Sequence, residues 1–184
     1  MPTKPSEKKT QKILLYGAPS SGKSMTAALV FAHLKLHFEN SELVREVAKD
    51  LVYEGLDLKH RTDALQLRIF ADQMTREELV DGRVDYLVSD SPLLLNAYYS
   101  GSEDLKKLAK KHLRGKELHF WLGKDPSHHE NAGRVHSLQE SKKIDQEMKT
   151  YLEECGIKLI EVTEPIETRG QWITQYVLKK LDIA

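Results

Sequence analysis

The sequence predicts an α/β protein whose parallel sheet is covered by helices on both faces. Three observations predict this class. Short apolar runs alternate with longer segments of helical periodicity, glycine, proline or polar residues bound the runs, and no repeat or long linker divides the chain. Strands that are joined through helices run parallel with right-handed crossovers, so both faces of their sheet are buried.

Length and composition favour one domain, which we expect over residues 12–184. A chain of 184 residues can bury a core of its own, and 40% hydrophobic and 30% charged residues exclude a disordered polar chain. No stretch approaches the ~20 apolar residues of a spanning helix, and residues 1–12 lack the apolar core of a signal peptide. The single cysteine, Cys155, excludes an internal disulfide. We therefore expect a cytoplasmic protein with no membrane partner, and an oligomer is not excluded.

The first elements follow from local patterns. Residues 1–11 carry two prolines and several lysines, and we expect a flexible basic tail there. The apolar run 12–16 predicts a buried strand that ends at Gly17. A helix is predicted over 22–37, with these apolar positions at helical spacing: Met25, Leu29, Ala32 and Leu36.

The next elements are shorter. Leu43 and Val44 with their flanks indicate a second strand, 47–53 one or two helical turns, and 55–60 a loop. Thr62 or Asp63 is predicted to cap a helix that runs to about Val80.

The second half continues the alternation. A strand over 85–89 is broken by Asp90, Ser91 and Pro92. The remaining predicted elements are a helix over 102–113, a strand over 118–122, a polar loop over 123–137, a helix over 138–154, a strand over 157–162 and a helix over 170–181.

Residues 17–24 match the phosphate-loop pattern G-x-x-x-x-G-K-[ST] at every fixed position. Such a loop turns backbone N–H groups and a helix N-terminus toward phosphate oxygens. Lys23 is expected to reach the β- and γ-phosphates of ATP, and Ser24 to coordinate Mg²⁺. A turn that binds nothing is the alternative, but the loop follows an apolar strand and opens a helix. We expect these residues to bind the nucleotide: Gly17, Ser20, Ser21, Gly22, Lys23, Ser24 and Met25.

Two acids follow predicted strands. Asp90 comes after an apolar strand, as in a Walker-B motif, and is expected to hold Mg²⁺. Glu46 follows the second strand and is expected to accept the proton of an acceptor hydroxyl. The two could exchange roles, and each could instead be a helix N-terminal acid that interacts with the dipole.

The loop 123–137 is the expected lid. Arg134, behind Gly133, is the best candidate for a phosphate clamp, because its planar guanidinium suits phosphate oxygens. Lys124 is the second candidate. A solvated basic residue is the alternative for both.

The helix after residue 60 carries the candidate acceptor site. Gln66, Phe70 and Gln73 share one face, where two amides beside an aromatic ring could recognise a nucleobase. Tyr98 could line the same cavity. The alternative is a core helix with amides at its wet margin.

The formal net charge is zero, with 28 Lys and Arg against 28 Asp and Glu. This balance excludes a generally basic protein that coats nucleic acid. The distribution is uneven, because six cations and no acid lie between Leu105 and Lys116. Five of them form a stripe that could meet DNA phosphates: Lys106, Lys107, Lys110, Lys111 and Arg114. Tail cations, among them Lys9 and Lys12, add to this charge. A solvated helix face is the alternative.

With these residues placed, the chain resembles the small P-loop kinases related to nicotinamide riboside kinase and deoxynucleoside kinases, and more closely a phage-encoded branch of them. Besides the phosphate loop, the resemblance depends on four short segments within residues 12–165. They are Glu46-Val47-Ala48, Gln66-Leu67, Asp90-Ser91-Pro92-Leu93-Leu94-Leu95 and Gly133-Arg134.

This resemblance implies a P-loop NTPase fold of the nucleoside/nucleotide kinase type, with a five-stranded parallel sheet in the order 2-3-1-4-5. It also implies transfer of the ATP γ-phosphoryl group, with Mg²⁺, to a nucleoside-like hydroxyl. Phage members include kinases of 5-hydroxymethyluracil in DNA, which makes this base our first expectation for the acceptor. Free nucleosides, nucleotides or nicotinamide riboside are the alternatives. A P-loop ATPase or nucleotide-gated binding module without an acceptor is the alternative of a different class.

Overall fold

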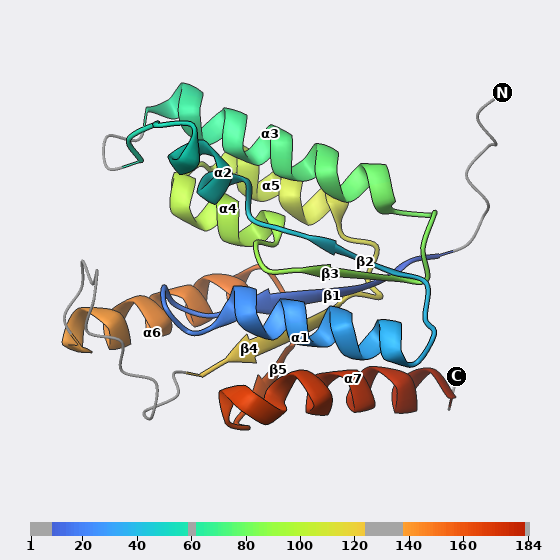
Figure 1. Ribbon diagram of the computed structural model, residues 1–184. Helices are drawn as coiled ribbons and strands as arrows, with labels where there is room; N and C mark the ends of the chain where they lie inside the picture. The colour runs from blue at the N-terminus through green and yellow to red at the C-terminus, as the bar shows by residue number, and fades with distance from the viewer. Residues whose placement is uncertain (1–8, 59–61, 124–137, 183–184) are drawn as a thin grey trace, which may run out of the picture.

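The computed structural model describes residues 9–58, 62–123 and 138–182, and five parallel strands form its sheet (Figure 1). The strands are β1 (Gln11–Tyr16), β2 (Ser41–Val44), β3 (Tyr86–Ser89), β4 (Leu118–Leu122) and β5 (Leu159–Val162). Their order is β2-β3-β1-β4-β5, which confirms the predicted topology. In register, Leu14 of β1 pairs with Ser89 of β3, and Tyr16 pairs with Trp121 of β4.

Six helices connect the strands in the described part of the chain, and a seventh follows β5. They are α1 (Lys23–Leu36), α2 (Val47–Tyr53), α3 (Asp63–Val80), α4 (Leu93–Ser100), α5 (Glu103–His112), α6 (Leu138–Glu154) and α7 (Ile166–Asp182). None of them is both long and apolar enough to cross a membrane.

Two hydrophobic cores lie on the two faces of the sheet (Figure 1). On one face α1 and α7 contribute Val30, Leu34 and Val177. On the other face α3 contributes Phe70, and α6 contributes Met148. The central strands β1, β3 and β4 are buried almost throughout, as expected for strands covered on both faces.

The predicted buried face of α1 was wrong. Met25 is 52% exposed and Leu36 is 73% exposed. Apolar residues of α1 point to several sides of the helix, so periodicity did not identify the buried side. Packing against α7 buries a different side from the one predicted. A Cβ atom at Gly170 of α7 would lie 2.4 Å from Cβ of Leu29, so the two helices approach closely there. The residues of α1 that are buried are Thr26, Ala27, Val30 and Leu34.

The helix α4 was not predicted. It begins after Pro92, and its first five residues, 93–97, are all buried. Since this helix has no polar side in its first turns, it lacks the periodicity that predicts an amphipathic helix.

Residues 9–11 lie against the body of the protein, although we expected them in the tail. β1 begins at Gln11, and the Thr10 hydroxyl donates to the Val84 carbonyl at 2.7 Å and accepts from the Gly82 N–H at 2.8 Å. Residues 1–8 lie outside the described part of the chain.

Candidate functional site

The loop between β1 and α1 lies at the carboxyl edge of the sheet (Figure 1). Its glycines fit into close contacts with other segments. A Cβ atom at Gly17 would lie 2.7 Å from the Leu122 carbonyl oxygen, and one at Gly22 would lie 2.6 Å from Cδ1 of Ile166. Gly22 also has φ 81°, in the left-handed region, where it begins α1. Larger residues at either position would displace the loop from β4 or α7.

The N-terminus of α1 has no acid in its first turn, and Gly22 has no side chain with which to cap it. Ser24 and Met25 are exposed in this turn, Ser20 is exposed in the loop, and Ser21 is buried. The first backbone N–H groups of a helix lack intrahelical partners and carry partial positive charge, which suits an anion.

Lys23 bends back over the loop. Its Nζ donates to the carbonyl oxygens of Gly17 at 2.8 Å and Ala18 at 3.0 Å. Burial lowers the pKa of Lys23, and the negative charges of Glu46, Asp90 and Asp145 oppose this shift, in that order. Carboxylates from three separate parts of the chain therefore act electrostatically on this ammonium group.

Two of these carboxylates were predicted from sequence. Glu46 is half-buried and occupies the N-cap position of α2, where its side chain makes no capping hydrogen bond. Asp90 follows β3 and is 5% exposed, and its Oδ1 has no hydrogen-bond partner in the described part of the protein. The structure thus brings Lys23, Glu46 and Asp90 together.

The third carboxylate, Asp145, was missed. It lies on α6, and its Oδ1 accepts a hydrogen bond from the backbone N–H of Ala18 at 3.2 Å. Nothing in the sequence distinguishes Asp145 from the other charged residues of this amphipathic helix.

Arg169 of α7 was also missed. It is 2% exposed and donates hydrogen bonds to three backbone carbonyls, those of Ser21 at 3.0 Å, Gly123 at 3.5 Å and Glu164 at 3.2 Å. This one side chain joins the phosphate loop, the end of β4 and the loop before α7. A cation in the first turn of a helix, where acids are preferred, was the only available signal.

The residues present fit a magnesium ion. Mg²⁺ usually keeps several waters and takes one or two carboxylates together with substrate phosphates. The exposed hydroxyl-bearing Ser24 and the buried Oδ1 of Asp90, which lacks a partner in the part of the chain that the structure describes, offer such a minimal set. No group of three or more His, Cys, Asp or Glu side chains that could hold a metal ion occurs among the described residues.

The candidate acceptor residues on α3 are all buried. Gln66 is 8% exposed, and its Nε2 has no hydrogen-bond partner among the described residues. Gln73 is fully buried, and its Oε1 accepts from the Val47 N–H at 3.0 Å. Phe70 is 1% exposed and packs in the core beside α4, so its ring offers no face for a nucleobase to stack on. For Phe70 the structure favours the alternative of a core residue.

Tyr98 lies in a cluster of aromatic rings between α4 and α6. Its ring packs edge-on against Tyr99 at 5.4 Å and Tyr151 at 5.3 Å between centroids. Packing among these rings therefore explains the position of Tyr98, and an acceptor cavity is not needed to explain it.

Three of the five cations in the predicted stripe have carboxylate partners. Lys106 pairs with Glu103 at 3.5 Å and lies over the Tyr151 ring. Lys107 pairs with Asp104 at 3.2 Å, and Arg114 pairs with Asp81 at 3.1 Å. The exposed residues Lys110 and Lys111 have no ion pair with the described part of the chain.

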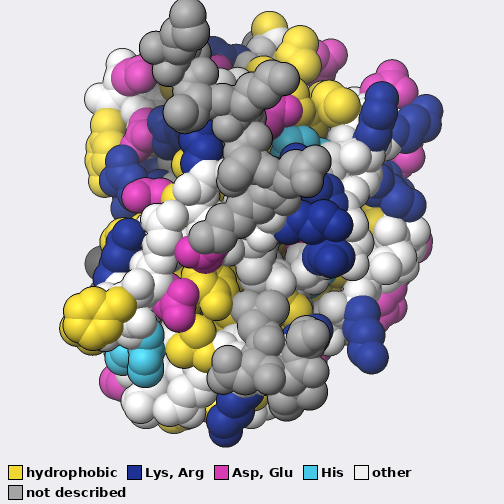
Figure 2. Space-filling view, turned by 90° about the vertical axis from the view of Figure 1, so that its right-hand side faces the viewer, with side chains coloured by type: hydrophobic (Ala, Val, Ile, Leu, Met, Phe, Trp, Pro, Cys, Tyr) yellow, Lys and Arg dark blue, Asp and Glu magenta, His cyan; other side chains and the backbone are white. Residues whose placement is uncertain are grey.

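Basic residues also gather at the amino edge of the sheet, the end opposite the phosphate loop. Figure 2 shows Lys and Arg side chains together on this face. A pocket there is lined by Lys9, Thr10, Lys12, Arg114, Lys116 and Glu117.

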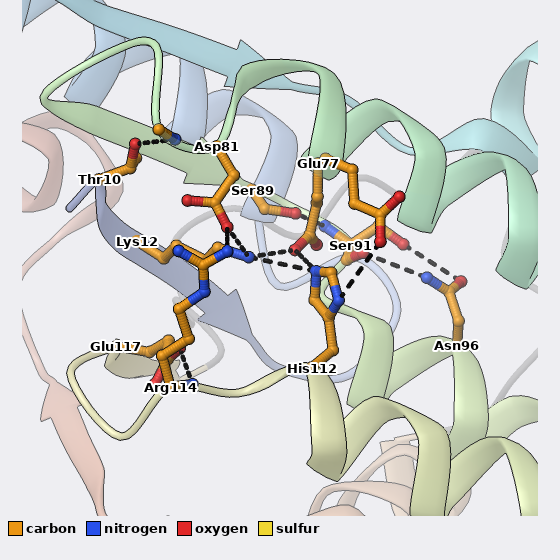
Figure 3. A network of polar contacts seen from close by, with 12 residues as sticks. Thr10, Lys12, Glu77, Asp81, Ser89, Ser91, Asn96, His112, Arg114 and Glu117 are labelled. Atoms are coloured by element: carbon orange, nitrogen blue, oxygen red, sulfur yellow. Dashed lines mark hydrogen bonds and ion pairs between the residues drawn. The ribbon is translucent and has the colours of Figure 1, made fainter. Parts of the chain in front are cut away.

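We expected Lys12 among the cations of the tail, but it belongs to a buried charge network (Figure 3). Its Nζ lies 3.3 Å from Glu77, 3.3 Å from Asp81 and 3.3 Å from Nε2 of His112. Burial raises the pKa of Glu77 to about 7, although Lys12 opposes the shift, and burial lowers the pKa of His112. This network connects β1, α3 and α5 far from Lys23.

The expected lid lies almost entirely outside the described residues. The predicted residues Lys124, Gly133 and Arg134 lie outside the described residues.

Comparisons with known proteins agree with this fold. A family model described as AAA domain matches residues 12–169. The structure of NadR protein in complex with NR superposes with a TM-score of 0.65 at 14% identity and covers 84% of this chain and 46% of that chain. Thymidylate kinase from Ehrlichia chaffeensis superposes with a TM-score of 0.63 at 12% identity, and the match covers 92% of this chain and 99% of that chain. No curated protein matches the sequence significantly. The chain spans about half the length of the NadR chain, and at these identities the likeness shows the fold alone.

Proposed function

The chain belongs to this AAA domain family, and from that premise we propose that it is an ATP- and Mg²⁺-dependent kinase that phosphorylates a hydroxyl of a nucleoside-like acceptor. The observation that carries the proposal is the position of Lys23, which lies on the phosphate loop with Glu46 and Asp90 close to its ammonium group. Phosphoryl transfer depends mainly on positioning and on neutralisation of charge, and these residues suit both tasks.

Each side chain has one role in this proposal. The N–H groups at the start of α1 and the Lys23 ammonium bind the ATP phosphates, and Lys23 exchanges its bonds with Gly17 and Ala18 for phosphate oxygens. Ser24 and Asp90 hold Mg²⁺, which neutralises charge on the β- and γ-phosphates when it is bound. Arg134, in the expected lid, supplies a further cation to the γ-phosphate.

Glu46 accepts the proton of the acceptor hydroxyl. The hydroxyl oxygen forms a bond to the γ-phosphorus, the bond from this phosphorus to the bridging oxygen breaks, and ADP leaves with the electron pair. A carboxylate is sufficient as the base, because the acceptor oxygen needs its proton removed only as the new bond forms.

The fold and one buried amide support a nucleoside-like acceptor. Among proteins with the same fold, one is bound to NR and another is a thymidylate kinase, which supports a nucleoside-like molecule. Gln66, whose buried Nε2 has no hydrogen-bond partner within the described ranges, is the residue we propose to donate to the nucleobase of this acceptor.

Within this class, 5-hydroxymethyluracil in DNA of a phage is the acceptor suggested by sequence resemblance. Lys110 and Lys111 support it, because they are exposed cations without a carboxylate partner in the described part of the protein. Lys106, Lys107 and Arg114 support it less, because acids already pair with them. Free nucleosides, nucleotides and NR are therefore tested beside it.

The proposal is tested with γ-labelled ATP and a panel of acceptors: unmodified DNA, 5-hydroxymethyluracil DNA, free nucleosides, thymidylate and NR. We expect label in at least one acceptor. Label that appears only as inorganic phosphate, at the same rate with every acceptor, contradicts a kinase and favours a P-loop ATPase.

A further inference from the structure

The helix α3 holds the backbone on both sides of Glu46. Oε1 of Gln73 accepts a hydrogen bond from the Val47 N–H at 3.0 Å, and both residues are buried. Nη1 of Arg76 donates to the carbonyl oxygen of Arg45 at 3.4 Å. Gln73 and Arg76 are three residues apart and therefore lie on one face of α3. Residues 45 and 47 are thus both attached to the same rigid element.

The N-terminus of α2 needs such support. It has only seven residues, which is too short for a stable helix without tertiary contacts. A residue at the N-cap usually accepts a hydrogen bond from the first turn, but the side chain of Glu46 makes no such bond. Gln73 instead satisfies one of the helix N–H groups that have no intrahelical partner, so the carboxylate of Glu46 is not used for capping.

Arg76 is itself fixed by α2. Its Nη2 lies 2.8 Å from Oδ2 of Asp50, and this hydrogen bond is the main cause that lowers the pKa of Asp50. Arg76 therefore joins the residue before Glu46 to the first turn of α2 and fixes the direction in which that helix leaves β2.

We propose that Gln73 and Arg76 are positioning residues that aim the carboxylate of Glu46 at the acceptor hydroxyl. This inference depends on the proposed function, in which Glu46 is the base. A base that is displaced by about 1 Å can lose on the order of 100-fold in rate. Neither residue needs to touch ATP or the acceptor.

The test compares Gln73→Met and Arg76→Met with the matched control Arg68→Met. Methionine removes the acceptor of Gln73 or the donors of Arg76 at similar side-chain length. Arg68 also joins α3 to α2, but at the C-terminal end of α2, where it pairs with Glu54 at 3.3 Å. We expect kcat for transfer to fall about 10- to 100-fold in the first two variants, with the Kd of ATP within about twofold of wild type. Arg68→Met should keep kcat within about twofold.

A double-mutant cycle distinguishes positioning from general damage. In a Glu46→Gln protein the base is already lost, so Gln73→Met and Arg76→Met should each lower the residual rate by less than about twofold. If either variant repeats its full loss in that background, or leaves kcat unchanged in the wild-type background, the proposal is wrong for that residue. The Arg76 side chain is only partly buried, so Arg76→Met should fold and keeps the test available if Gln73→Met fails to fold.

A second measurement does not depend on activity. Amide hydrogen exchange at Val47 should become at least about tenfold faster in Gln73→Met and stay unchanged in Arg68→Met. We call the contacts of Gln73 with Val47 and of Arg76 with Arg45 the clamp. Unchanged amide exchange at Val47 in Gln73→Met contradicts the clamp itself. If the wild-type protein transfers phosphate to no acceptor, the proposed function fails, and with it the purpose of the clamp. If wild type is active and the variants match it, only the clamp fails.

Discussion

The guanidinium of Arg169 donates a hydrogen bond to the Ser21 carbonyl oxygen at 3.0 Å, across 148 positions of the sequence. Arg169 comes from the first turn of α7, and Ser21 lies in the loop that we propose binds the phosphates of ATP. The same side chain reaches Gly123, the first residue of the expected lid. One buried cation thus fixes three segments at the carboxyl edge of the sheet.

We predict that Arg169→Met destabilises the protein by about 3 kcal/mol, because three carbonyls lose a charged donor, that of Ser21 in a buried hydrogen bond and the other two in part-buried ones. It should also weaken ATP binding at least about tenfold, because the phosphate loop loses its contact with α7. Chemical denaturation and ATP titration measure the two effects. Lys179→Met, which removes an exposed cation near the end of the same helix, should change neither. Unaltered ATP affinity in Arg169→Met contradicts a role in shaping the loop.

We predict that Asp90→Asn raises the Mg²⁺ concentration for half-maximal transfer about tenfold, because an amide binds this cation more weakly than a carboxylate. Binding of ATP in the absence of Mg²⁺ should not weaken. Asp85→Asn is the control, since Asp85 precedes the opposite end of the same strand. A magnesium titration identical to that of wild type shows that Asp90 does not hold the metal.

The buried Glu77 predicts a pH-dependent stability. Its pKa is raised from 4.5 to about 7, so the folded protein binds this proton more tightly than the unfolded chain. The stabilisation is complete below about pH 4.5 and is lost as the pH rises toward 7, by up to about 3 kcal/mol. Glu77→Gln cannot lose the proton. The free energy of unfolding of wild type should therefore fall relative to Glu77→Gln between pH 5 and 7.

Denaturant titrations at several pH values measure this difference. His112, whose pKa burial lowers, contributes the opposite dependence, but it is present in both proteins and largely cancels. The control Glu54→Gln changes an exposed acid and should show a nearly constant difference from wild type. A constant difference for Glu77→Gln would mean that Glu77 is ionised in the folded protein throughout this range.

Much of the fold was predictable because its signals are local. The central strands are continuous apolar runs, the strand order followed from the resemblance, and the phosphate-loop pattern lies within eight residues. The helix α4 escaped because its first turns are buried on every side and carry no amphipathic pattern. The buried side of α1 was wrong because the packing of Gly170 against Leu29, not periodicity, selects it.

The candidate site was predictable only where residues follow strands directly. Glu46 and Asp90 were found because the carboxyl ends of parallel strands meet at one edge. Asp145 contacts Ala18 across 127 positions, and Gln73 contacts Val47 across 26. These contacts arise from how helices pack on the sheet, and no spacing in the sequence encodes them. The buried Lys12 could not be distinguished from its solvated neighbour Lys9 for the same reason.

We predict that Glu46→Gln retains ATP binding within about twofold of wild type, because the side chain keeps its size and the phosphate loop is unchanged. Turnover should fall at least about 100-fold, because the amide cannot accept the hydroxyl proton. Equilibrium ATP titration and steady-state transfer rates separate the two effects. Turnover close to that of wild type would assign the base to another group, with Asp90 as the next candidate.

The central claim is that this protein moves the γ-phosphoryl group of ATP to an acceptor hydroxyl. The most direct measurement follows γ-labelled phosphate from ATP into the acceptor panel, with wild type and with Lys23→Met side by side. We predict label in a nucleoside-borne hydroxyl with wild type, and transfer at least about 100-fold slower with Lys23→Met, which lacks the proposed phosphate-binding cation. Label found only in inorganic phosphate, or equal transfer by both proteins, would contradict the claim.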